Sequence, residues 1–314
     1  MSSPGFAEIP LPGRRATIRL WHEDGLAGIV RRRGRAGFDA IVTSPPYNLR
    51  QPYASYRDDM PREAYLAWIG ELGAAADRAL SAGGSFFLNV GSPPRDPWLA
   101  WDVARRIGER FVLQNVLHWI KSIAIDRRHA GRASGVARDL ALGHYRPVGS
   151  TRYVHGAHEY VFHFSRTGTV PIDRLAIGVA YQDRSNARRW RDGRRGLRCR
   201  GNTWFLPYAT IQSGARDRPH PATFPPTLAE WCLRLHGVAR IHRWADPFVG
   251  IGSSAVAAVR AGRTFEGFDI DRGYLAEARR RVREALRAER AGSSGAGPAR
   301  SRAAAGSTRG SAAS

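Results

Sequence analysis

The stretch Thr-Ser-Pro-Pro-Tyr-Asn at 43–48 carries the groups that would hold a planar base with an exocyclic amine. The Ser44 hydroxyl and the backbone carbonyls would accept hydrogen bonds from the amine, and the ring of Tyr47 would stack on the base. Because Pro45 and Pro46 lack backbone N–H groups and fix φ, the stretch is expected to be a stiff loop. Taken alone, Pro-Pro-Tyr is more often an ordinary turn with a half-buried tyrosine.

A second stretch, Asp-Pro-Phe-Val-Gly-Ile-Gly at 246–252, has the pattern of a strand end followed by a tight turn and a helix start. Glycines at positions 250 and 252 would let the backbone approach a ligand closely. Asp269, expected at the end of the next strand, would accept hydrogen bonds from a ribose hydroxyl, as in dinucleotide-binding folds. An NAD site and a plain turn are both compatible with this pattern.

Hydrophobic periodicity predicts the elements that position these two stretches. Strands are expected at 17–21, 39–42, 85–90, 113–120, 158–164, 244–246 and 265–269, and helices at 26–31, 61–80, 98–108, 228–235, 253–260 and 272–290. The pair Gly83-Gly84 is expected to end the second helix. The alternation predicts an α/β fold with a doubly wound, mostly parallel sheet. Since such sheets bind ligands at the carboxyl ends of their strands, the two stretches should meet there.

The 314-residue chain has a formal net charge of +22, which favours a polyanionic partner. Lys121 is the only lysine, so a genomic bias towards arginine codons explains the arginines, but it does not explain the excess of base over acid. No apolar run approaches about 18 residues and no signal peptide is visible, so we expect no membrane span. The two cysteines, Cys199 and Cys232, do not make a disulfide framework, which fits a reducing cytoplasm. We expect the protein in the bacterial cytoplasm, associated with the nucleoid.

Residues 166–218 interrupt the alternation of strands and helices, and we call them the arginine-rich insertion. Within 182–218, ten arginines stand against three aspartates, and Trp190, Trp204 and Phe205 interleave with them. Arginine forks beside aromatic rings suit contacts with phosphates and base edges. The candidates for DNA contact are Arg184, Arg188, Arg189, Arg191, Arg194, Arg195, Arg198 and Arg200. A solvated basic loop is the alternative interpretation.

In combination, these motifs resemble the amino-group DNA methyltransferases over about residues 17–288. The catalytic loop comes first, the arginine-rich insertion next and the cofactor loop last, an order similar to the permuted β class of that family. The Ser-Pro-Pro-Tyr form is most like the enzymes that methylate the N4 amine of cytosine. The resemblance implies a Rossmann-like fold that depends on S-adenosylmethionine, with target recognition in the insertion and double-stranded DNA as the substrate.

The resemblance also implies roles for individual residues. Ser44 and the carbonyl of Pro45 would orient the amine, Pro46 would complete the loop, and Tyr47 would stack on a base flipped out of the duplex. The expected cofactor-binding residues are Asp24, Phe224, Pro225, Asp246, Phe248, Gly250, Gly252 and Asp269. On the residues alone, Asp24 is better explained as the N-cap of helix 26–31. Ile251 stands where the family more often has Ser or Thr.

The predicted organisation has five parts. They are an N-terminal tail (1–16), a catalytic half (17–165), the arginine-rich insertion (166–218), a cofactor-binding half (219–290) and a disordered tail (291–314).

Several alternatives stay open on the sequence. The same loop serves N6-adenine and RNA methyltransferases, and the charge alone would suit a non-catalytic DNA-binding protein. A C5-cytosine enzyme would need a cysteine that follows a proline, and neither cysteine does. His158 and Glu159 lie on opposite faces of a strand, so we assign no metal. The sequence also leaves open a companion restriction endonuclease and a homodimer.

Overall fold

The computed structural model describes residues 6–131, 134–143, 149–181, 196–207 and 223–295. Within these residues, nine strands form one sheet in the order β1-β2-β13-β12-β3-β4-β8-β5-β11. The strands are β1 (Phe6–Pro10), β2 (Thr17–His22), β3 (Phe38–Thr43), β4 (Leu80–Val90), β5 (Val112–Ile120), β8 (His158–Ser165), β11 (Thr203–Phe205), β12 (Arg243–Asp246) and β13 (Thr264–Asp269). Only β1 and β8 run antiparallel to their neighbours in this sheet, so the predicted doubly wound, mostly parallel fold is confirmed.

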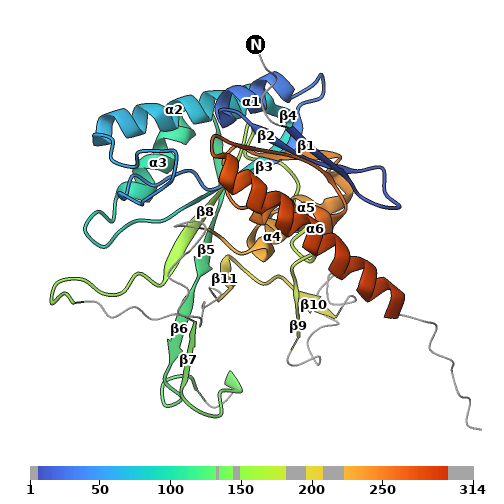
Figure 1. The fold of residues 1–314 in the computed structure, drawn as a ribbon. Coiled ribbons are helices and arrows are strands. Elements are labelled where there is room, and N and C mark those ends of the chain that lie inside the picture. Colours follow the sequence, from blue (N-terminus) through green and yellow to red (C-terminus); the bar gives the residue numbers. More distant parts are fainter. Residues whose placement is uncertain (1–5, 132–133, 144–148, 182–195, 208–222, 296–314) are drawn as a thin grey trace, which may run out of the picture.

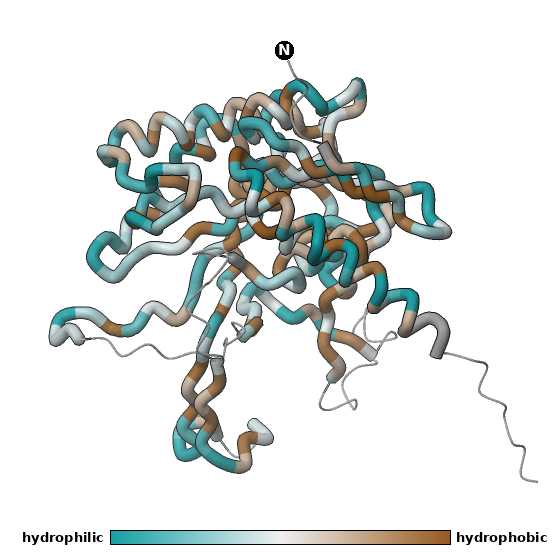
Figure 2. Tube along the Cα trace, viewed as in Figure 1, coloured by the Kyte–Doolittle hydropathy of each residue, from teal (hydrophilic) through white to brown (hydrophobic). Residues whose placement is uncertain are grey.

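Helices cover both faces of the sheet, as Figure 1 shows. One face carries α1 (Gly25–Arg32), α2 (Arg62–Ala79) and α3 (Leu99–Gly108), and the other carries α4 (Pro226–His236), α5 (Ser253–Ala261) and α6 (Arg272–Gly295). Each face has its own core of buried apolar side chains. On α2, for example, Tyr65, Ile69 and Leu72 repeat at helical spacing and are fully buried. Figure 2 shows the same division, with hydrophobic colour on the strands and hydrophilic colour along the outer side of α6.

The two middle strands carry the two stretches that the sequence singled out. Strand β12 pairs in parallel with β3, with Trp244 opposite Ala40 and Ala245 opposite Ile41. From β12 the chain continues through α5 to β13 on one side, and from β3 it continues through α2 to β4 on the other. This divergence makes the boundary between β12 and β3 the switch point at which such sheets place their ligands.

Some predicted boundaries are wrong for local reasons. The helix predicted for 61–80 ends at Ala79, because Leu80 is already extended, and Gly83-Gly84, which was predicted to end the helix, lies inside β4. A Cβ on Gly84 would lie 2.6 Å from Leu80 Cγ, so the glycine serves close packing within the strand. At the N-terminus, residues predicted as a tail form the edge strand β1, which tolerates the terminal Pro10. At the other end, α6 runs to Gly295, into the tail predicted from 291.

Two short hairpins project away from the sheet and its helices (Figure 1). They are β6 (Ser122–Ile125) with β7 (Leu140–Gly143), and β9 (Val179–Ala180) with β10 (Leu197–Arg198). The first was not predicted. The second belongs to the arginine-rich insertion, whose flanks are part of the main fold, because Val170 and Ile177 are buried and β11 pairs with β5.

Candidate active site

The predicted meeting of the two loops occurs at the carboxyl ends of β3 and β12. Thr43 Oγ1 donates a 2.5 Å hydrogen bond to Asp246 Oδ1, although the two residues are 203 positions apart. The same carboxylate accepts bonds from the Ser254 hydroxyl and from the Phe248 N–H at 3.0 Å. Burial raises the pKa of Asp246 to about 6, and these donors partly offset that rise. Asp246 therefore holds the two loops together.

The hydroxyl of Tyr47 is the centre of a buried polar network. It lies 2.8 Å from Ser44 Oγ, 3.0 Å from Glu159 Oε2 and 3.2 Å from Asn89 Oδ1. Glu159 Oε1 in turn accepts a 2.9 Å bond from Lys121 Nζ. Burial, and then the charge of Glu159, raise the pKa of Tyr47 well above 10. The tyrosine is therefore neutral, and its ring is fixed by the bonds at its hydroxyl.

Residues after the tyrosine are held by one buried carboxylate that the sequence analysis missed. Asp58, which is 3% exposed, accepts bonds from the backbone N–H groups of Asn48 at 2.8 Å and Leu49 at 2.9 Å. Asn48 has a φ of 58°, a left-handed conformation that asparagine tolerates. Tyr65 donates to the carbonyl of Pro46 at 3.0 Å. The Pro46 carbonyl thus already accepts one hydrogen bond, and the Pro45 carbonyl as an acceptor for the substrate amine stays a prediction.

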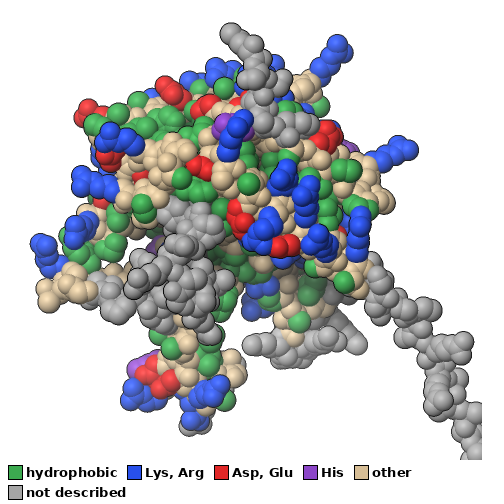
Figure 3. Space-filling view, viewed as in Figure 1, with side chains coloured by type: hydrophobic (Ala, Val, Ile, Leu, Met, Phe, Trp, Pro, Cys, Tyr) green, Lys and Arg blue, Asp and Glu red, His purple; other side chains and the backbone are tan. Residues whose placement is uncertain are grey.

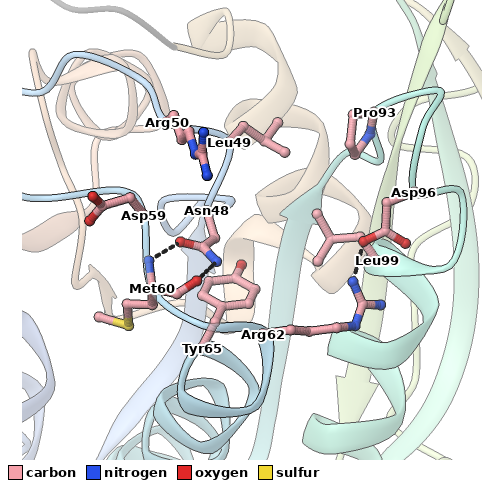
Figure 4. Close-up of a pocket in the computed structure, with 10 residues that line it drawn as sticks. All are labelled: Asn48, Leu49, Arg50, Asp59, Met60, Arg62, Tyr65, Pro93, Asp96 and Leu99. Atoms are coloured by element: carbon pink, nitrogen blue, oxygen red, sulfur yellow. Dashed lines mark hydrogen bonds and ion pairs between the residues drawn. The ribbon is translucent and has the colours of Figure 1, made fainter.

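Figure 4 shows a pocket on the outer side of this loop, between α2 and the start of α3. The Asn48 side chain clamps the backbone of Met60 with two bonds of 2.7 Å, and Arg62 pairs with Asp96 across the pocket. None of Ser44, Tyr47, Asp246 or Asp269 lines it. This pocket is therefore separate from those four candidate residues, and its contacts stiffen the loop.

The acidic side chains predicted for the cofactor lie at neighbouring strand ends. Asp269 Oδ2 accepts a 3.0 Å bond from the Gly250 N–H, and burial raises the pKa of Asp269 to about 6. Asp24 is exposed and caps α1 by accepting a 2.8 Å bond from the Ala27 N–H. A Cβ on Gly25 would lie 1.9 Å from the Pro247 carbonyl oxygen, so the turn at Asp24 presses against the cofactor loop. The cap is confirmed, and a contact between Asp24 and adenine stays a prediction.

The structure gives Gly252 of the cofactor loop a packing role that the sequence did not suggest. Gly252 has a φ of +84°, and a Cβ there would lie 2.7 Å from Ala278 Cβ on α6. Gly250 has a φ of 50°. Backbone conformation and helix packing therefore require a glycine at position 252, and the close approach of this loop to the cofactor stays a prediction.

The remaining cofactor candidates border apolar structure. Phe248 is half-buried and packs on Trp68 at 5.5 Å between ring centroids. Phe224 is 8% exposed in the core beneath α4, and Pro225 is the N-cap residue of α4. All three residues thus have structural roles in this chain, and contacts between them and a cofactor stay predictions.

A family model described as DNA methylase, labelled for N6 and N4 methyl transfer, matches residues 38–280. The chain belongs to this DNA methylase family. Among curated relatives, the Type II methyltransferase M.ScaI of Streptomyces caespitosus is 27% identical over 280 residues, which cover 82% of this chain and 79% of the relative. M.BglII of Bacillus subtilis is 23% identical over 253 residues, which cover 76% of this chain and 61% of the relative.

Two solved structures share the fold of this methylase. The cytosine-N4-specific PvuII DNA methyltransferase superposes with a TM-score of 0.57 and 15% identity, covering 86% of this chain and 91% of its own. TTHA0409 from Thermus thermophilus, solved in complex with S-adenosyl-L-methionine, gives a TM-score of 0.53 and 21% identity over 85% of this chain and 95% of its own.

The cofactor of the methylase is S-adenosylmethionine, and the residues at the strand ends fit it. Carboxylates at Asp269 and Asp24 are acceptors suited to ribose hydroxyls and an adenine amine, and the half-buried ring of Phe248 offers an apolar surface. Among the described residues, no group of three or more His, Cys, Asp or Glu could hold a metal ion. No helix in that same part of the chain is long and apolar enough to cross a membrane.

The DNA-contact candidates are only partly placed by the structure. Arg184, Arg188, Arg189, Arg191, Arg194 and Arg195 lie outside the described residues. Arg198 is exposed on β10. The Arg200 guanidinium lies 4.3 Å from the ring centroid of Trp231 and donates to the Ile177 carbonyl at 2.9 Å. Arg200 therefore packs the insertion onto α4, and a DNA contact for it stays a prediction.

Asn89, Lys121 and Glu159 are the other network members to which the sequence analysis gave no definite role. Each stands at or beside a strand end, where β4, β5 and β8 converge. A polar residue at the end of an otherwise apolar run, as Asn89 is, was the available signal.

Proposed function

We propose that this methylase transfers a methyl group to the exocyclic N4 amine of cytosine at a specific site in duplex DNA. The observation that carries the proposal is the pairing of Ser44 with Tyr47. The acceptor facing the base is a neutral hydroxyl, held 2.8 Å from a buried tyrosine hydroxyl. A serine accepts one N4 hydrogen without the several kcal/mol needed to bury an unpaired carboxylate.

The residues then act by orientation. The base flips out of the duplex, the Tyr47 ring stacks on it, and Ser44 Oγ and the Pro45 carbonyl accept the two amine hydrogens. Bound S-adenosylmethionine supplies an electrophilic methyl group. Holding the amine with its lone pair towards that methyl group provides much of the rate enhancement, because alignment replaces a bimolecular encounter.

We further propose that duplex DNA lies along the edge from which the two hairpins project. Strand β5 runs parallel to β4, so hairpin β6–β7 extends beyond the same edge that carries the catalytic loop. Figure 3 shows arginine side chains gathered at the far end of this hairpin. Arg127 and Arg138 are exposed there, and Arg198 is exposed on the other hairpin. The curated relatives are Type II methyltransferases, so we also propose a role in restriction-modification.

N6-adenine methylation is the second candidate, since the family model covers both amines. Nucleoside mass spectrometry of DNA methylated by the purified protein separates the two. N4-methylcytosine supports the proposal, and N6-methyladenine alone overturns it.

A further inference from the structure

Glu159, at the start of β8, is the charged end of the network around Tyr47. Its side chain is 16% exposed, and Oε1 accepts a bond from Lys121 Nζ at 2.9 Å. Its other oxygen, Oε2, receives the Tyr47 hydroxyl at 3.0 Å and Asn89 Nδ2 at 3.1 Å. The Lys121 ammonium forms an ion pair with this carboxylate. The Glu159 carboxylate therefore lies two hydrogen bonds from Ser44, through the Tyr47 hydroxyl.

The direction of the hydrogen bonds follows from counting protons. The Tyr47 hydroxyl has one proton and two acceptors within reach, Glu159 Oε2 and Asn89 Oδ1. The carboxylate is nearer and forms the stronger, charge-assisted bond, so the proton points to Glu159. The Tyr47 oxygen is then free to accept the Ser44 proton across 2.8 Å. Because Ser44 donates its proton to Tyr47, its oxygen lone pairs are available to accept a hydrogen bond from a bound base.

We propose that Ser44, Tyr47 and Glu159 form a proton relay from the substrate amine to the Glu159 carboxylate. This inference rests on the proposed function only in that Ser44 holds the amine. Before transfer, the charge of Glu159 polarises both hydroxyls and strengthens Ser44 as an acceptor. Ser44, with the charge of Glu159 behind it, thereby does the work that a carboxylate in direct contact with the base would do.

The relay also accounts for the proton that transfer releases. The amine nitrogen forms the new N–C bond while the methyl–sulfur bond breaks and leaves its electron pair on sulfur. The nitrogen is then positive and passes one proton to Ser44 Oγ. Ser44 passes its own proton to Tyr47, and Tyr47 passes its proton to Glu159. The product amine is neutral, and the proton rests on the Glu159 carboxyl group.

The first test is Glu159→Gln, which keeps the shape of the side chain and removes the charge. We expect single-turnover methylation to slow by about 10²-fold or more, as for loss of an oriented electrostatic partner. Cofactor affinity by calorimetry should be unchanged, as should flipping of a fluorescent cytosine analogue at the target. Glu230→Gln is the matched control. The Glu230 side chain is 15% exposed and also forms an ion pair, with Arg260, but it lies on α4, away from the Tyr47 network. It should methylate at the wild-type rate.

The second test separates a relay from a merely structural contact. Ser44→Asp places a carboxylate directly at the amine, so the double variant Ser44→Asp/Glu159→Gln should be at least tenfold faster than Glu159→Gln alone. The double variant Tyr47→Phe/Glu159→Gln should methylate no more slowly than the slower of its two single variants, because both changes interrupt the same relay. A wild-type rate for Glu159→Gln, or no rescue by Ser44→Asp, overturns the relay. Absence of N4-methylcytosine from wild-type product overturns the proposed function instead.

Discussion

Thr43 Oγ1 lies 2.5 Å from Asp246 Oδ1, and this one bond joins the last residue of β3 to the last residue of β12. The catalytic loop begins after Thr43, and the cofactor loop begins after Asp246. Because both residues are buried, the bond fixes the separation between the two loops with little freedom. Productive alignment of an amine with a methyl donor depends on such a fixed separation.

Thr43→Val should weaken this junction without changing the shape of the side chain. The Asp246 carboxylate would lose one of its donors, which typically destabilises a fold by about 1–3 kcal/mol. The pKa of Asp246 is about 6, so its charge is present at pH 8 and largely absent at pH 5. The loss measured by urea denaturation should therefore be larger at pH 8. Thr43→Ser keeps the hydroxyl and serves as the control, and equal stability of the two variants at pH 8 would contradict this role.

Gly252→Ala should destabilise the protein through α6. The residue has a φ of +84°, and the new Cβ would meet Ala278 Cβ at 2.7 Å. The left-handed conformation alone costs about 1–2 kcal/mol for a residue with a Cβ. Thermal denaturation should show the loss. The loss should be smaller in an Ala278→Gly background, where the contact with the Ala278 Cβ is gone and the contact with the Ala278 Cα at 2.9 Å remains. If the second change brings no recovery, the contact with α6 is not the cause.

Two buried histidines should make the fold sensitive to acid. Ser85 Oγ lies 2.9 Å from His163 Nε2 and 2.8 Å from His236 Nδ1. Burial lowers the pKa of His163 to about 3 and that of His236 to about 4. The stability contributed by the neutral rings is fully present above pH 6.5, the ordinary pKa of histidine. It is lost as the pH falls from there to about 4 for His236 and to about 3 for His163.

The corresponding measurement is the free energy of unfolding against pH. Each histidine should contribute a slope of about 1.4 kcal/mol per pH unit in the middle of that window. His236→Gln should remove the contribution of one histidine, about 1.4 kcal/mol per pH unit, from the slope. This holds whatever the effect of the change on stability at pH 7.5. Identical slopes for the two proteins would show that folding does not lower the pKa of His236.

Arginines on the projecting hairpins should control the salt dependence of DNA binding. Each phosphate contact contributes about −0.9 to the slope of log affinity against log salt. Arg127→Ala, Arg138→Ala or Arg198→Ala should therefore each reduce the slope by about one contact, for all sequences alike. Arg78→Ala is the matched control, since Arg78 is exposed near the start of β4, at the opposite edge of the sheet. An equal change in the control would remove the hairpins from the interface.

Local pattern was sufficient to predict the sheet and the meeting of its two loops. Alternating and continuous apolar runs marked β3 and β4, and a strand followed by glycines marked the cofactor loop. The hydrogen bond between Tyr47 and Glu159, which are 112 residues apart, could not be predicted, because it depends on β8 lying antiparallel beside β4. The role of Asp58 could not be predicted either, because it accepts hydrogen bonds from backbone N–H groups, which every residue except proline has.

In the proposed reaction, Ser44 presents the amine of a flipped cytosine to the methyl donor. The most direct measurement is mass spectrometry of nucleosides from duplex DNA treated with this protein and S-adenosylmethionine labelled in its methyl group. We predict labelled N4-methylcytosine from the wild type and, at equal DNA and cofactor binding, formation about 10²-fold slower from Ser44→Ala. Labelled N6-methyladenine without N4-methylcytosine, or a wild-type rate from Ser44→Ala, would contradict the account.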